Sequence, residues 1–195
     1  MKQFKILILI SFALISAGVP VQNTYTIAKG YTVTIHGTSN LHNWTESVGT
    51  VTGNSIVSTN SDGSFNMETL TIKIVVRSIK STEGGAMNNN TYKALKADVD
   101  PEIIFTLTTP LKSIKAGTNA IAISANGNMT IAGVTKPVIM QVKAAMPQKG
   151  VMEFEGTQAI KMTDYSVNPP TALFGALKTG NDITITFKTD FSQSN

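Results

Sequence analysis

The sequence has no cysteine among its 195 residues. This absence excludes a disulfide framework, a thiolate-based zinc site and the acylated thiol of a lipoprotein. Stability must therefore come from a hydrophobic core. About 177 residues would remain after removal of the leader described next, and a domain of that size buries roughly 70% of its unfolded surface.

Long hydrophobic runs are also scarce, because only Ile6 to Ile15 forms an almost unbroken one. Lys2 and Lys5 precede this run, and the small residues 16–18 follow it. The pattern predicts a cleaved signal peptide over residues 1–18 and a periplasmic or secreted mature domain over residues 19–195. No later segment approaches the roughly 18 apolar residues of a membrane span, so we expect no integral membrane segment in the mature chain.

The net positive charge of the chain is too small to indicate a nucleic-acid partner. The net charge of +4 falls to +2 when Lys2 and Lys5 leave with the leader. The nearest approach to a basic cluster, formed by Lys73, Arg77 and Lys80, has no aromatic residues interleaved with it. It is therefore interpreted as a solvated strand face, and nucleic acid is excluded as a partner.

What the sequence does contain is alternation of apolar and polar residues. In residues 182–191 Ile183, Ile185 and Phe187 share one parity, whereas threonines and a lysine take the other, which is typical of a half-buried strand. About eight such strands with short connections predict an antiparallel sandwich or barrel. The clearest further stretches are residues 70–76, 103–107, 121–131 and 138–142, and weaker ones are 31–35, 48–57 and 151–160.

Two segments lack the strand pattern. Residues 88–102 offer asparagine caps, apolar residues at helical spacing and a stop before Pro101, which predicts a short helix. Residues 167–180 contain Pro169-Pro170, which can start a helical turn, and Phe174 in an apolar ALFGAL core, and we expect them to fold over one end of a barrel. No linker or repeat divides the chain, so one domain is expected.

Three stretches, "MNNNTYKALKADVDPEIIFTLT" (87–108), "GNMTIAGVTKPVIMQV" (127–142) and "KMTDYSVNPPTALFGALKTGNDITITFKTDF" (161–191), closely resemble the YceI-like family of extracytoplasmic bacterial proteins. The resemblance covers nearly the whole mature chain. It implies an all-β fold, a single lipocalin-like antiparallel barrel of about eight strands with one short helix. It also implies that the interior holds a long isoprenoid or similar lipid chain.

The inward-facing apolar residues have two interpretations. From their parity alone they close a dry core more readily than they line a tunnel. The resemblance favours the tunnel, in which the flexible methionines would suit a lipid. The candidate ligand-binding residues of the interior are Ile74, Val76, Phe105, Met129, Met140, Phe154, Phe174 and Phe187.

The stretch "HGTSNLHNWTES" (36–47) holds both histidines and the single tryptophan. Leu41 and Trp44 are expected to plug one end of the barrel, with His42 as a hydrogen-bonded rim residue. In the alternative, Trp44 touches the ligand and His42 donates to its polar head, so Leu41, His42 and Trp44 are ligand-binding candidates. The commoner family pattern here is Ser-x-x-Phe-x-x-x-His, from which this stretch departs. A metal site would have to use His36, His42, Glu46 and Asp164, but no metal-binding spacing is present, so no metal is expected.

These observations predict extracytoplasmic binding, carriage or sequestration of a long-chain apolar lipid of isoprenoid, quinone-like or fatty-acyl type. The alternative is a dry-cored structural or interaction domain of the cell envelope that holds no ligand. No serine-nucleophile motif occurs, so neither an enzyme nor a cofactor other than bound lipid is expected. The assembly state stays open, with a homodimer as one option.

The leader yields the first testable prediction. If residues 1–18 are a signal peptide, the exported protein begins near Val19, because the small residues before it suit signal peptidase. N-terminal sequencing of exported protein measures this directly. A chain that starts at Met1 would contradict it.

Overall fold

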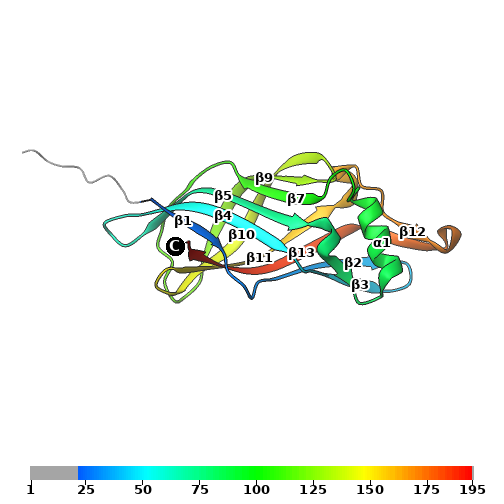
Figure 1. Cartoon of the computed structure of the whole chain (residues 1–195), viewed down its shortest axis with the longest axis horizontal. Coiled ribbons are helices and arrows are strands. Elements are labelled where there is room, and N and C mark those ends of the chain that lie inside the picture. Colours follow the sequence, from blue (N-terminus) through cyan, green and yellow to red (C-terminus); the bar gives the residue numbers. More distant parts are fainter. Residues whose placement is uncertain (1–21, 195) are drawn as a thin grey trace, which may run out of the picture.

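The computed structural model describes residues 22–194 and consists mainly of antiparallel strands (Figure 1). Eight strands pair in the order β1-β4-β5-β7-β9-β10-β11-β13, and pairing of β1 with β13 closes the sheet. The predicted antiparallel barrel with one helix is therefore confirmed. The barrel strands are β1 (Gln22–Ile27), β4 (Val51–Thr59), β5 (Phe65–Val75), β7 (Glu102–Leu107), β9 (Ile121–Ile131), β10 (Val134–Gln148), β11 (Val151–Lys161) and β13 (Leu177–Gln193).

Three further strands lengthen the barrel at one end. β13 is long enough to pair with β1 near its C-terminus and with β2 (Thr32–Ser39) nearer its start. β2 pairs in turn with β3 (Asn43–Val48), and β3 pairs with β6 (Ile79–Ser81). Two short strands lie off this path, β8 (Leu111–Ile114) on β5 and β12 (Thr171–Ala172) on β13.

Three chain segments bend at the same level, where β1 gives way to β2, β3 to β4 and β5 to β6. Side-chain hydroxyls bond to backbone groups across the bend. The Tyr31 hydroxyl donates to the Gly49 carbonyl and accepts from the Val51 N–H, both at 3.0 Å. The Ser78 hydroxyl accepts from the Thr50 N–H at 2.9 Å. The bend lets the barrel continue past this level without a break in pairing.

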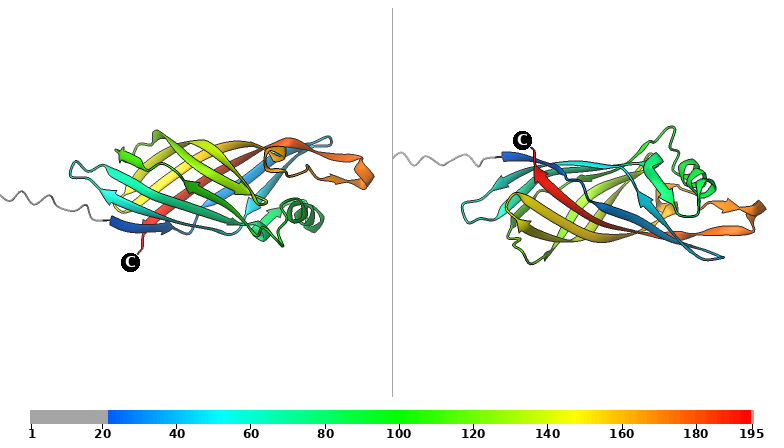
Figure 2. Two further views of the ribbon diagram at one scale, coloured as in Figure 1. Left: turned by 90° about the horizontal axis from the view of Figure 1, so that it is seen from above. Right: turned by 60° about the horizontal axis from the view of Figure 1, so that its bottom comes forward.

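The end of the barrel that holds the C-terminus is packed solid. Both views in Figure 2 place that terminus opposite helix α1 (Gly85–Ala94). Phe191, Met67 and Met152 are each 1% exposed there. The rings of Phe154 and Phe191 meet edge to face with centroids 5.8 Å apart, a favoured aromatic geometry. These side chains belong to the buried hydrophobic core.

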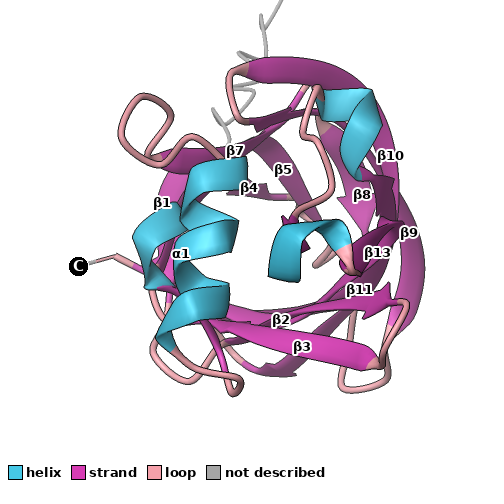
Figure 3. Ribbon diagram, turned by 90° about the vertical axis from the view of Figure 1, so that its right-hand side faces the viewer, coloured by secondary structure: helices cyan, strands magenta, loops and turns pink. Residues whose placement is uncertain are grey.

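At the opposite end α1 lies across one side of the barrel opening (Figure 3). The predicted helix exists, but its expected range of 88–102 was wrong at both ends. It starts at Gly85, and it stops at Ala94 because Lys96 takes a left-handed φ of 55°. That conformation cannot continue a right-handed helix.

The segment 167–180 was expected to fold over the barrel end, and only its base does so. Residues 171–178 form a hairpin in which β12 pairs with the start of β13. This hairpin projects beyond the barrel (Figure 1). Phe174, near its tip, has a φ of 53° and is fully exposed.

Inside the barrel the Phe105 ring lies against Gly127 on the neighbouring strand. A Cβ built on Gly127 would come within 2.3 Å of this ring and 2.7 Å of the Thr106 carbonyl oxygen. Gly127→Ala should therefore lower the free energy of unfolding by about 1–3 kcal/mol through overpacking. Gly117→Ala is the control, because nothing lies within 4 Å of that position. Urea unfolding of the two variants tests this prediction. Equal free energies of unfolding would show that the Phe105 ring moves aside at no cost.

Candidate functional site

The helix-bearing end of the barrel contains a cavity of about 270 Å³. Its walls come from β2, β3, β7, β9, β11, β13, α1 and the segment between β11 and β13. The volume is nearly twice the roughly 150 Å³ of an apolar cavity that holds benzene. The barrel interior is thus packed at one end and hollow at the other.

The cavity wall contains a belt of isoleucines. Isoleucine is branched at Cβ and keeps few rotamers in a strand, so it forms a stiff wall. Two pairs of them lie side by side on neighbouring strands, because Ile35 pairs with Ile185 and Ile160 with Ile183. The isoleucine belt comprises Ile35, Ile103, Ile131, Ile160, Ile183 and Ile185.

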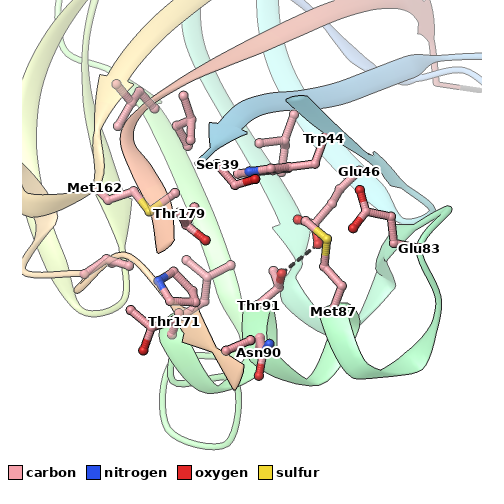
Figure 4. A pocket seen from close by; sticks show the side chains of 18 of the residues that line it. Ser39, Trp44, Glu46, Glu83, Met87, Asn90, Thr91, Met162, Thr171 and Thr179 are labelled. Atoms are coloured by element: carbon pink, nitrogen blue, oxygen red, sulfur yellow. Dashed lines mark hydrogen bonds between the residues drawn. The ribbon is translucent and has the colours of Figure 1, made fainter. Parts of the chain in front are cut away.

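One acidic side chain faces this apolar wall. Glu46 lies on the inward parity of β3 and is only 2% exposed. The Thr91 hydroxyl of α1 donates a 2.6 Å hydrogen bond to its Oε1 (Figure 4). Within residues 22–194, Oε2 of Glu46 has no hydrogen-bond partner. The site therefore combines an apolar wall with a buried carboxyl group.

Burial raises the pKa of Glu46 above its ordinary value of 4.5. The Thr91 hydrogen bond opposes the rise, and the nearby negative charge of Glu83 adds to it. Glu83 lies at the mouth, where its Oε1 is 3.5 Å from Nδ1 of His42. His42 Nδ1 also lies 2.8 Å from the Asn43 carbonyl oxygen.

Trp44 forms part of the wall beside Glu46 and is held in a fixed position. Its ring covers Gly37 on β2, where a Cβ would come within 2.1 Å of it. Its Nε1–H donates a 3.0 Å hydrogen bond to the Thr38 carbonyl oxygen. A large ring with a satisfied polar atom thus closes one side of the cavity.

The structure brings two of the predicted ligand-binding residues, His42 and Trp44, to the cavity wall. Leu41 lies outside it, 72% exposed at the turn between β2 and β3. Phe174 is exposed on the hairpin. Phe105, Met129 and Phe187 occupy the next inward position below the isoleucine belt, and Ile74, Val76, Met140 and Phe154 pack elsewhere in the core.

Sequence reasoning missed much of the wall. It gave Glu46 a role only in a metal site, although Trp44, Glu46 and Val48 share the buried parity of β3. An acidic residue on an inward strand position is the signal that would have identified it. The residues that α1 contributes to the cavity wall carried no such signal, because that helix buries none of its residues fully.

The two histidines do not share a site. His36 lies on the outer face of β2, where its ring nitrogens contact the hydroxyls of Thr34 and Thr45 at 2.9 and 3.0 Å. The part of the chain described, 22–194, contains no group of three or more His, Cys, Asp or Glu that could hold a metal. Over the same range no helix is long and apolar enough to cross a membrane.

Comparison with known proteins places this fold and cavity in context. A family model described as a YceI-like domain matches residues 23–191. A polyisoprenoid binding domain from Saccharophagus degradans has a TM-score of 0.69 at 12% identity, over 87% of this chain and 98% of that one. BcnA of Burkholderia cenocepacia has a TM-score of 0.59 at 16% identity, over 82% and 95%.

A Campylobacter jejuni YCEI protein has a TM-score of 0.53 at 16% identity, over 100% of this chain and 99% of that one. No curated protein matches the chain. At these identities the solved structures establish a shared fold.

Trp44→Ala should lower the free energy of unfolding by roughly 3–5 kcal/mol, because it removes a buried ring and its hydrogen bond. Trp44→Phe keeps an aromatic ring over Gly37 and loses the Nε1–H bond, so a smaller loss is expected. Urea denaturation followed by circular dichroism measures both. A near-neutral Trp44→Ala variant would contradict the assignment of this ring as a structural wall.

Glu46 predicts a pH dependence of stability. Because its pKa is raised on folding, the folded state holds the proton more tightly, and stability falls as pH rises from 4.5 through the raised value. The Glu46→Gln side chain cannot ionise, so the stability of this variant relative to wild type should increase as pH rises through that window. Below and above the window the stability difference should be constant. Urea unfolding at pH 4, 6 and 8 tests this. A stability difference between Glu46→Gln and wild type that does not change with pH would contradict this prediction.

Proposed function

This chain belongs to the YceI-like domain family, and we propose that it binds the apolar chain of a lipid in the hollow end of its barrel. The observation that carries the proposal is the cavity enclosed by the isoleucine belt. An apolar ligand is favoured there because each CH₂ removed from water contributes about 0.8 kcal/mol. The role is binding, with carriage or sequestration as its consequence.

The size of the cavity bears on how a long chain would fit. About 270 Å³ accommodates only part of a long prenyl or acyl chain as the side chains now stand. Met129 below the belt and Met162 in the wall are unbranched and can change rotamer with little cost. The remaining length would extend deeper past these methionines or out through the mouth.

An isoprenoid is the ligand class we favour. The Saccharophagus degradans domain that shares this fold is described as polyisoprenoid binding. The wall of this chain offers a stiff, largely aliphatic surface that suits such a chain. Quinone-like and fatty-acyl chains would meet the same surface and are the competitors to test.

We also propose that the protein works outside the cytoplasm. Support comes from the sequence alone, since the basic start, the apolar run and the small residues of 1–18 lie outside the described residues. A lipid chain exposed to water in such a compartment would need a carrier or a shield.

Filling the cavity tests the proposal. Ala94 lines it from α1, so Ala94→Trp should occupy a large share of its volume. Ala159→Trp is the matched control, because Ala159 is exposed on β11. Organic extraction of each purified protein followed by mass spectrometry should recover a long-chain lipid from wild type and the control. The amount recovered from Ala94→Trp should fall several-fold.

Equal lipid recovery from a folded Ala94→Trp variant would place the lipid outside this cavity. Recovery of no lipid from any of the three, together with failure to take up added isoprenoid, would reject the binding function. That outcome would favour the alternative of an envelope interaction domain.

A further inference from the structure

We propose that Glu46 makes the cavity selective for lipids whose head group carries no negative charge, such as alcohols and amines. The inference rests on the proposed lipid binding and adds the chemistry of the head group. It assigns Glu46 as the residue that meets that head and Thr91 as the residue that positions the carboxyl group.

The position of Glu46 in the wall is the first argument. The side chain projects from β3 toward α1, within a lining that is otherwise mostly apolar (Figure 4). Thr91 already donates to Oε1, whereas Oε2 has no partner within residues 22–194. The oxygen that Thr91 leaves unused belongs to a side chain of the cavity lining, so a ligand donor can bond to it without displacing a protein group.

The sign of the charge at the mouth is the second argument. Two carboxyl groups, Glu46 and Glu83, line the cavity. Among its lining residues in the described chain none is lysine or arginine. His42 is the one lining side chain that can become positive, and it lies against Glu83. An anionic head group would meet these carboxyl groups at the mouth, with no lysine or arginine in the lining to receive it.

The hydrogen-bonding capacity of Glu46 indicates which head groups fit. An ionised Glu46 accepts a hydrogen bond from a hydroxyl or an ammonium group. A protonated Glu46 donates one to a carbonyl oxygen and accepts one at its other oxygen. Carboxylate and phosphate monoester head groups have no proton to donate to an ionised Glu46, and the negative charge of Glu83 opposes their binding to the protonated form.

Chain-matched probes test the proposal on the delipidated wild-type protein. Binding of 1-dodecanol, dodecylamine, dodecanoate and methyl dodecanoate is measured by isothermal titration calorimetry at pH 8. We expect dodecanoate to bind at least about tenfold more weakly than the alcohol, the amine and its own methyl ester.

The residue assignment is tested with Glu46→Gln, which keeps the acceptor for Thr91 and removes the charge. Glu46→Gln should reduce the difference in binding affinity between dodecanoate and its methyl ester severalfold. Glu155→Gln is the control, because that carboxylate lies on the barrel exterior beside Lys143. The control variant should leave this difference in affinity unchanged.

Each outcome decides a separate claim. If wild type binds all four probes equally, head-group selectivity is wrong and lipid binding stands. If wild type discriminates but folded Glu46→Gln discriminates equally, the role of Glu46 is wrong. If none of the probes binds, the proposed function itself fails. Should Glu46→Gln not fold, Glu83→Gln and the ester comparison on wild type still test the effect of mouth charge.

Discussion

Pairing of the first described strand with the last one is the constraint on which the rest of the structure depends. The register from Tyr25 opposite Gln193 to Ile27 opposite Phe191 closes a sheet of eight strands. An eight-stranded barrel has an interior just wide enough to be filled by side chains or to hold one small ligand. Whether a given level is packed or hollow therefore depends on the residues that point inward there. Phenylalanines and methionines fill the level near the C-terminus, and the isoleucine belt leaves its level open.

The buried carboxyl of Glu46 is in tension with that apolar interior. Removing a charged group from water is expensive unless it is paired, and a raised pKa is one way in which the protein lowers the cost. Thr91 supplies a single hydrogen bond, and Glu83 adds repulsion rather than relief. A core that served stability alone would be better packed with an aliphatic residue at this position. The carboxyl is thus more readily explained by binding than by folding.

The alternation of apolar residues was enough to predict the barrel, because an inward stripe such as Ile183, Ile185 and Phe187 has the same period wherever it lies in a sheet. The same property explains why the lining could not be predicted. Phe105 and Ile103 share one parity, and only the three-dimensional level separates a residue that fills the core from one that borders the cavity. The ends of α1 were also missed, since nothing in the sequence marks Lys96 as left-handed. Trp44 lies in the cavity wall against Gly37, whereas Leu41, which was expected to form a plug with it, is exposed at a turn.

The central claim is that the helix-bearing end of the barrel is a hollow binding site. A crystal structure of the protein purified with its natural contents tests it most directly. The account predicts elongated electron density between α1 and β13, bounded by the isoleucine belt, with one end close to Glu46. An interior in which α1 and the wall residues close the cavity, with no ligand density after isoprenoid is added, would contradict it.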